Sequence, residues 1–184
     1  GRILLIGCII PDGHNIQDFK HSSPNWQRFM RQVGRDDWPG LSTGYGEHSA
    51  RVYVIHSDDD GRTWSPIQDI TESAKKRDAL TCITGPGLGI QLTRGPHKGR
   101  LLVPAFQHRL RNLDGKMRYQ NLPFALMSDD NGTTWRHGEL APYVLETRTV
   151  TETQFVELED GSILMNARGG GRVTARSKDG GQTW

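Results

Sequence analysis

The sequence has little of what a disulfide-stapled, nucleic-acid-binding or membrane-spanning protein needs. It contains only two cysteines, Cys8 and Cys82, so no disulfide framework is implied, and pairing and free thiols both remain open. The 23 Lys and Arg residues nearly balance the 21 Asp and Glu residues, for a net charge of +2, which gives no reason to expect nucleic acid or an anionic membrane as a partner. The longest apolar run, ILLIGCII from Ile3, is too short to span a bilayer, so no membrane segment is predicted within these residues.

Signatures of metal sites and of common catalytic loops are missing or out of context. The seven histidines show no H-E-x-x-H or comparable spacing, so we predict no metal site. GLSTG from Gly40 matches the G-x-S-x-G nucleophile elbow by its letters, but it has no buried strand before it and no helix after it. GPGLG from Gly85 has no Lys-Ser/Thr behind it, which excludes a phosphate-binding loop of the usual kind.

What the sequence does contain is typical of a chain with many short strands and many turns. There are 22 Gly, 9 Pro and 5 Trp residues, and short apolar or alternating runs recur between glycine-rich turns. These runs predict an all-β fold. The strand candidates are residues 2–10, 51–57, 67–71, 89–93, 100–107, 122–128, 137–140, 153–158, 162–167 and 173–177.

An eight-residue pattern, S-x-D-x-G-x-T-W, occurs three times, as SDDDGRTW, SDDNGTTW and SKDGGQTW. Its acids and glycine invite a calcium hypothesis, but an EF-hand loop needs an acid five residues before the glycine and a Glu six residues after it, and the first two copies have neither. Each copy instead follows a strand-like run, where glycine supplies positive φ and a short carboxylate accepts backbone N–H groups. We therefore predict a structural turn, built by Ser57, Asp59, Gly61 and Trp64; by Ser128, Asp130, Gly132 and Trp135; and by Ser177, Asp179, Gly181 and Trp184.

A long polar segment, residues 12–47, separates the first two strand candidates and holds one predicted helix. Ser23 is a suitable N-cap, Pro24 suits the first helical position, and Gly34 suits the end. Trp26, Phe29, Met30 and Val33 follow helical spacing between them. Long insertions are often functional, and the alternative is a helix that merely covers a sheet edge.

Together the strands and boxes predict a single domain, residues 1–184, that forms part of a β-propeller with four-stranded antiparallel blades. Each box is expected to lie between the third and fourth strands of a blade. About two and a half blades are expected here. The sequence opens on a strand-like run and stops at the tryptophan of the third box, so we expect an internal segment of a longer protein.

The repeated pattern resembles the Asp box, or BNR repeat, of sialidases (neuraminidases). Two more stretches are more specific to that family: TGPGLGIQL from Thr84 with GRLLVPAFQHR behind it, and TETQFVELEDGSILMNAR from Thr151 to Arg168. The sequence is most similar to the exo-sialidases of bacteria and animals. This resemblance implies a six-bladed propeller, a sialylated glycan as substrate, hydrolysis without a cofactor, and a secreted or periplasmic location if the source is bacterial.

The resemblance also assigns roles to particular residues. Glu152 matches the glutamate that partners the family's nucleophilic tyrosine, and Arg168 matches one of three arginines that bind the sialic acid carboxylate. Phe106 and His108 match aromatic positions beside the substrate, and Asp78 matches an acidic sugar-binding position, although KKRDALTC departs from the family sequence there. The acid/base aspartate, the tyrosine and the other two arginines are expected outside these residues.

The chemistry explains why these residue types are needed. A planar guanidinium binds a carboxylate through two parallel hydrogen bonds. A neutral tyrosine avoids repulsion with the sugar's own carboxylate but needs a base, which is the role expected of Glu152. The alternatives without a catalytic role are a surface salt bridge for Arg168 and a solvent-facing strand position for Glu152. At the level of the whole protein, the alternative to an exo-sialidase is a non-catalytic propeller that binds carbohydrate or protein.

Overall fold

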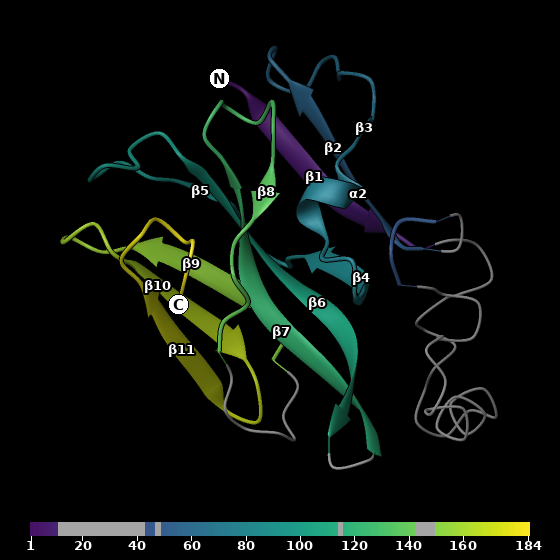
Figure 1. Cartoon of the computed structure of the whole chain (residues 1–184). Coiled ribbons are helices and arrows are strands. Elements are labelled where there is room, and N and C mark those ends of the chain that lie inside the picture. The colour runs from purple at the N-terminus through teal and green to yellow at the C-terminus, as the bar shows by residue number, and fades with distance from the viewer. Residues whose placement is uncertain (11–42, 47–48, 114–115, 143–149) are drawn as a thin grey trace.

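The computed structural model describes residues 1–10, 43–46, 49–113, 116–142 and 150–184, and these residues are almost entirely β-structure (Figure 1). The predicted all-β fold is therefore confirmed. The elements are β1 (Ile3–Ile9), β2 (Arg51–Ser57), β3 (Gln68–Asp69), the short helix α2 (Thr71–Ala74), β4 (Ala79–Thr84), β5 (Ile90–Gln91), β6 (Leu101–Leu113), β7 (Lys116–Ser128), β8 (Arg136–His137), β9 (Thr153–Glu157), β10 (Ile163–Arg168) and β11 (Arg172–Ser177).

The strands form three antiparallel sheets that follow one another along the chain (Figure 1). The first sheet has the order β1-β2-β3, the second β4-β6-β7-β8 with β5 also paired to β6, and the third β9-β10-β11. One apolar core lies between the first and second sheets, and another between the second and third. Three sheets packed face to face in sequence are the arrangement of consecutive propeller blades.

Strand β7 shows why the second sheet is the centre of this stack. Phe124 and Leu126 belong to the core shared with the first sheet, whereas Ala125 and Met127 belong to the core shared with the third. Since successive side chains of a strand point to opposite faces, a strand buried on both faces has an unbroken apolar sequence. The run LPFALM has this pattern, and all of its residues are buried.

Most predicted strands are confirmed, with corrections. Of the candidate 89–93 only Ile90 and Gln91 form a strand, and the candidate 137–140 overlaps β8 only at His137. Strand β4 was not predicted, and β6 and β7 form one hairpin far longer than the two separate segments expected. The candidate strand 67–71 is also wrong in part: only Gln68 and Asp69 pair, and the chain then turns into α2, where the Asp69 carboxylate accepts a hydrogen bond from the Thr71 amide (2.8 Å). The predicted helix beginning near Ser23 lies outside the described residues.

The second sheet has five strands, one more than the predicted four-stranded blade, because β4 and β5 both pair with β6; as predicted, its box turn joins the last two strands, β7 and β8. The first and third sheets each contain three strands within the described residues. The question of the two cysteines is also answered: Cys8 and Cys82 are both free thiols, and Cys82 lies in the core between the first two sheets.

The three boxes share one network of hydrogen bonds among their serine, aspartate, glycine and threonine residues. In the second box, the Ser128 hydroxyl donates to Asp130 (2.8 Å) and accepts from the Gly132 amide (2.8 Å). Both oxygens of the Asp130 carboxylate then accept from Thr134, from its amide (2.8 Å) and its hydroxyl (2.6 Å). These hydrogen bonds lower the pKa of Asp130 to about 2. The first and third boxes repeat the network, so the carboxylate of each box is occupied by its own turn.

Arg2 ties the first box to the second. Its guanidinium forms two parallel hydrogen bonds with Asp58, at the second position of the first box (2.7 and 2.8 Å). The remaining terminal nitrogen donates to the backbone carbonyl of Asn131, at the fourth position of the second box (3.3 Å). One side chain placed just before β1 therefore joins its own blade to the next one.

Arg100, just before β6, makes the equivalent contacts one blade further along. It bonds Asp129 at the second position of the second box (2.6 and 3.2 Å) and the carbonyl of Gly180 at the fourth position of the third box (3.0 Å). We call these two arrangements the arginine clamps. The third sheet has no such pair in the described residues, because Ser162 stands before β10 and Lys178 takes the second position of the third box.

The glycines of the second and third boxes pack against β1 and β6, the strands that directly follow Arg2 and Arg100. A Cβ on Gly132 would lie 2.8 Å from a methyl of Leu4, and a Cβ on Gly181 would lie 3.0 Å from a methyl of Leu102. Both glycines also have positive φ, +86° and +88°. Glycine is therefore needed at this position for its backbone conformation and for the close approach of the adjacent blade.

Glu157 forms a further polar contact between the second and third sheets. Its carboxylate, on a side chain that is only 9% exposed, accepts hydrogen bonds from the amide (2.8 Å) and hydroxyl (2.7 Å) of Thr93 and from the amide of Arg94 (3.0 Å). Burial raises the pKa of Glu157, but these hydrogen bonds and the nearby Arg94 charge outweigh burial, so the pKa is lowered overall.

This lowered pKa predicts a pH-dependent contribution to stability. The contribution is complete above the ordinary pKa of a glutamate and is lost as the pH falls through the lower folded-state pKa. We expect Glu157→Gln to lower the free energy of unfolding of the chain by about 1–3 kcal/mol near pH 7 and by clearly less near pH 3. Urea unfolding at both pH values measures this, with the exposed Glu159→Gln as control. An equal loss at both pH values would contradict the assignment.

Candidate active site

Glu152 and Arg168 are placed side by side by the pairing of β9 with β10. Thr153 pairs with Ala167, so the residues just beyond them, Glu152 and Arg168, face each other at the end of the sheet opposite the box. Two backbone hydrogen bonds continue the pairing, from the Arg168 amide to the Glu152 carbonyl and from the Thr151 amide to the Arg168 carbonyl (both 2.9 Å). Two sequence-predicted site residues, 16 positions apart, are thus neighbours in space.

The two side chains form an exposed ion pair. One terminal nitrogen of Arg168 donates to both carboxylate oxygens of Glu152, at 2.9 and 3.0 Å. The side chains are 67% and 41% exposed, so both groups are accessible to a ligand. Within the described residues, the second terminal nitrogen of Arg168 makes no hydrogen bond, and its N–H groups are therefore available to an incoming carboxylate.

A polar cleft of about 380 Å³ adjoins this pair and is lined by Pro86, Glu152, Gln154, Asn166 and Arg172. The side-chain amide of Gln154 donates to the Pro86 carbonyl (3.2 Å), which brings the GPGLG loop against β9. A Cβ at Gly87 would meet the Gln154 side-chain amide, which is flexible and exposed, so a larger residue at position 87 would displace that amide from the Pro86 carbonyl.

Sequence reasoning missed Arg172, Asn166 and Gln154. What connects them to the site is the strand register, in which Arg172 pairs with Arg168 and Asn166 pairs with Gln154. Polar residues that alternate along β9 and β10 mark this face of the third sheet.

Phe106 and His108 lie on β6 and are buried, at 7% and 8% exposure. Their rings meet edge to face with centroids 5.4 Å apart, and Nδ1 of His108 lies 2.8 Å from the Thr81 hydroxyl. Burial lowers the pKa of His108 to about 3, so its ring is neutral near pH 7. No contact described here joins either ring to Glu152 or Arg168, and their role beside the substrate stays a prediction.

Asp78 directly precedes β4 and forms an ion pair with Arg109 of β6. Its side chain is 57% exposed, whereas that of Arg109 is 11% exposed. Its sugar-binding role, like the other assigned roles, remains a prediction. Within the described residues, no group of three or more His, Cys, Asp or Glu side chains is arranged to hold a metal ion.

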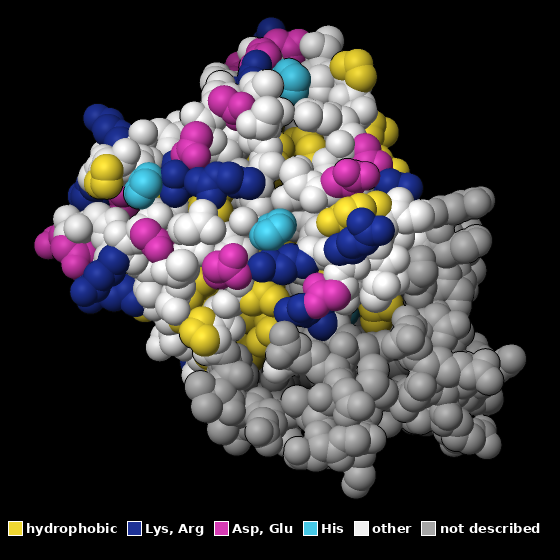
Figure 2. Space-filling view, in the orientation of Figure 1, with side chains coloured by type: hydrophobic (Ala, Val, Ile, Leu, Met, Phe, Trp, Pro, Cys, Tyr) yellow, Lys and Arg dark blue, Asp and Glu magenta, His cyan; other side chains and the backbone are white. Residues whose placement is uncertain are grey.

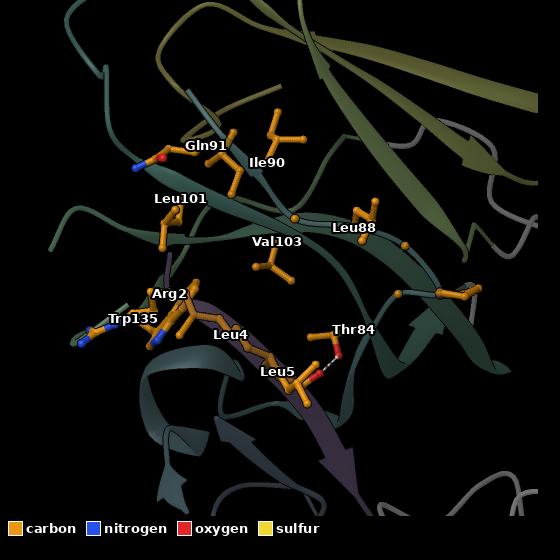
Figure 3. Close-up of a pocket in the computed structure, with 16 residues that line it drawn as sticks. Arg2, Leu4, Leu5, Thr84, Leu88, Ile90, Gln91, Leu101, Val103 and Trp135 are labelled. Carbon is orange, nitrogen blue, oxygen red and sulfur yellow. Dashed lines mark hydrogen bonds between the residues drawn. The ribbon is translucent and has the colours of Figure 1, made fainter. Parts of the chain in front are cut away.

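A larger groove of about 540 Å³ lies elsewhere, between β1 and the segment from Thr84 to Gln91 (Figure 3). Leu4, Leu5 and Val103 make its walls largely apolar, and Arg2 is its one titratable side chain among the lining residues. The groove runs along the edge of β1 that has no partner strand in the described first sheet. In the second sheet, the corresponding edge of β6 is paired with β4 and β5. The groove therefore has the character of a position for a further strand.

The described surface carries charges of both signs. On the face shown in Figure 2, acidic and basic side chains are interspersed, in agreement with the net charge of +2. Among the described helices, none is long and apolar enough to cross a membrane.

Comparisons with known proteins identify the family of the chain. The family described as BNR repeat-like domain matches residues 32–184. Human sialidase-4 is 37% identical over 151 residues, which cover 76% of this chain and 30% of that protein, so the chain spans about a third of its length.

Two solved structures have a similar fold. The intramolecular trans-sialidase of Ruminococcus gnavus, in complex with oseltamivir carboxylate, has a TM-score of 0.59 at 32% identity and is matched over 74% of this chain and 26% of its own. The leech intramolecular trans-sialidase, complexed with 2,7-anhydro-Neu5Ac, also has a TM-score of 0.59, at 30% identity over 74% of this chain and 19% of its own. These similarities confirm the predicted sialidase-like propeller. The chain therefore belongs to the sialidase family of BNR-repeat proteins.

Proposed function

We propose that this chain is part of an exo-α-sialidase, which releases terminal sialic acid from glycoconjugates. The observation that carries the proposal is the exposed Glu152–Arg168 pair at the end of the sheet opposite the box. A blade needs no ion pair there for its fold, since the register is already held by backbone hydrogen bonds. Sialidase relatives support the same reaction class.

Arg168 binds the carboxylate that sialic acid carries on its anomeric carbon. A guanidinium stays charged at any working pH and offers donors in a planar fork. Glu152, which contacts one terminal nitrogen, fixes the orientation of this fork and leaves the other donors open to the substrate.

Glu152 has a second role as the base beside a tyrosine nucleophile. The tyrosine attacks the anomeric carbon while its proton passes to Glu152, and the glycosidic bond breaks as the acid/base aspartate protonates the departing oxygen of the rest of the glycan. Water, deprotonated by the same aspartate, then displaces the tyrosine, which regains its proton, and sialic acid is released with retention of configuration. No cofactor takes part in this scheme. In the proposal, the tyrosine, the acid/base aspartate and two further arginines come from residues beyond this chain.

It follows that the 184-residue chain alone should not turn over a sialoside, whereas the longer protein that contains it, called the full-length protein below, should. The test is incubation of each with 3'-sialyllactose, followed by NMR of the products. Free sialic acid that appears first as the α-anomer from the full-length protein supports a retaining hydrolase. Turnover by the short chain alone would contradict the division of the site.

The same experiment separates two other functions. The likeness to intramolecular trans-sialidases favours one alternative, in which the product is 2,7-anhydro-Neu5Ac instead of free sialic acid. The other is a non-catalytic propeller, for which 3'-sialyllactose would be bound by the full-length protein but recovered unchanged.

A further inference from the structure

The second and third sheets each place an acid–arginine pair at the same position. Glu152 directly precedes β9 and pairs with Arg168 at the end of β10, while Asp78 directly precedes β4 and pairs with Arg109 of β6. In backbone register, Thr153 faces Ala167 next to the first pair, and Ala79 faces Arg109 itself. Each pair thus joins the start of a blade's first strand to the strand beside it.

Both pairs also lie at the same end of the stack. The boxes follow β7 and β11, at the opposite ends of their sheets, and the clamp from Arg100 to the Gly180 carbonyl aligns those two ends with each other. The Asp78 and Glu152 ends are therefore aligned as well. Two adjacent blades present their acid–arginine pairs on one face of the protein.

The two pairs differ in which partner is exposed. In the third sheet the arginine is the more exposed partner, 67% against 41% for Glu152. In the second sheet the acid is the more exposed one, since Asp78 is 57% exposed and Arg109 only 11%. The shared face therefore offers a guanidinium from one blade and a carboxylate from the next, which suits a ligand with an anionic group and hydrogen-bond donors at different places.

We propose that Arg109 is a positioning residue, which holds the Asp78 carboxylate ready to accept a hydrogen bond from a hydroxyl or amide N–H group of the sugar whose carboxylate binds Arg168. The inference rests on the proposed function and adds a specificity contact to the same site. A half-buried ion pair suits this task, because the buried guanidinium fixes the direction of the exposed carboxylate. A carboxylate accepts hydrogen bonds only, so this position selects sugars with a donor there.

The chain around Asp78 is held in place by two further contacts. The carbonyl of Arg77 accepts a hydrogen bond from the Gly44 amide (2.8 Å), which fastens the segment leading into β2 beside Asp78. Lys75, fully buried, donates to the Ser49 hydroxyl (2.6 Å) in the same segment. The backbone on the N-terminal side of Asp78 is thus anchored independently of its side chain, so a change at Asp78 leaves these supports intact.

The test uses steady-state kinetics of the full-length protein with a sialoside and with deoxy analogues that each lack one hydroxyl. We expect Asp78→Asn and Arg109→Met each to raise KM by roughly 10- to 100-fold, the effect of losing a hydrogen bond to a charged group, with kcat changed much less. Arg109→Lys should recover part of the loss. The double variant should be no worse than Asp78→Asn alone, since Arg109 acts through Asp78.

The matched control is Glu139→Gln, which breaks the neighbouring ion pair with Lys76 (3.0 Å) and should leave KM unchanged. For one deoxy analogue, wild type and Asp78→Asn should have the same KM, and this identifies the donor. KM within twofold of wild type in Asp78→Asn, or equal additive losses in the double variant, would overturn the inference. If Arg109→Met does not fold, Asp78→Asn and Arg109→Lys decide it. A wild-type protein that neither binds nor turns over the sialoside would instead overturn the proposed function itself.

Discussion

Replacing Arg168 by alanine should lower kcat/KM of the full-length protein for a sialoside by roughly 30-fold to several thousand-fold. The loss of one partner of a desolvated charge pair typically costs about 2–5 kcal/mol, and about 1.4 kcal/mol corresponds to a factor of ten in rate. Arg168→Lys should recover only part of the activity, because an ammonium keeps the charge but loses the two-pronged geometry. The matched control is Arg176→Ala, which removes an exposed arginine of the same sheet that pairs with Asp160.

Glu152→Gln should have a different effect from Arg168→Ala, because the two residues have different roles. Turnover should fall while a carboxylate-bearing inhibitor still binds, since Arg168 keeps its free donors. Circular dichroism must show that all variants are folded. If Arg168→Ala binds that inhibitor as tightly as wild type does, the carboxylate-binding role is wrong, and the pair with Glu152 is an ordinary surface salt bridge.

The propeller fold was predictable because the box pattern carries its own local physics. Serine, aspartate, glycine and threonine at fixed spacing form a turn that is closed by its own hydrogen bonds, as the Ser128–Asp130 network shows. Three such turns, each behind an apolar run, indicate repeated antiparallel units. The pattern is local, so it can be recognised in the sequence without knowledge of any tertiary contact.

Strand β4 and the long β6–β7 hairpin were not predictable in the same way. Strand β4 follows the charged stretch KKRD, and its pairing with β6 includes a register shift between Ala79 and Thr81, so no simple alternation marks it. The added part of the hairpin, RLRNLDGKMRYQ, is polar, and its pairing comes from backbone hydrogen bonds that a hydrophobic pattern does not report.

The candidate site was predictable as a set of residue types but not as a geometry. Glu152 and Arg168 were assigned from a resemblance, whereas their ion pair depends on the exact register of β9 with β10. Arg109 and Arg172 were missed because an arginine in a polar strand is most often a surface residue. Only the pairing of strands shows that each lies beside a residue of the predicted site.

The arginine clamps were also missed, although a sequence signal for them exists. Arg2 and Arg100 each stand directly before an apolar strand, and the second position of the box that follows is aspartate in both cases, Asp58 and Asp129. Where the arginine is absent before β10, the aspartate is absent too, and Lys178 takes its place. This joint presence and joint absence is what a charge pair between the two positions predicts.

Arg100→Met should therefore destabilise the chain more than the same change at an exposed arginine, by about 1–3 kcal/mol in urea unfolding. Methionine keeps the aliphatic part of a side chain that is only 7% exposed, but it leaves the buried Gly180 carbonyl without its donor and removes two hydrogen bonds to Asp129. Arg62→Met, at an exposed position of the first box, is the control and should change stability by less than about 0.5 kcal/mol.

A double-mutant cycle then separates the two halves of this clamp. Asp129→Asn removes the ion pairs of Asp129 with Arg100 and with Arg136 (3.1 Å) but leaves the bond from Arg100 to the Gly180 carbonyl. The coupling between Asp129→Asn and Arg100→Met isolates the Arg100–Asp129 contact and should be about 0.5–3 kcal/mol. If the two losses simply add, the Arg100–Asp129 contact contributes nothing of its own. If Arg100→Met is no worse than Arg62→Met, the second and third blades are held together by their other contacts, and the arginine is an incidental neighbour of both boxes.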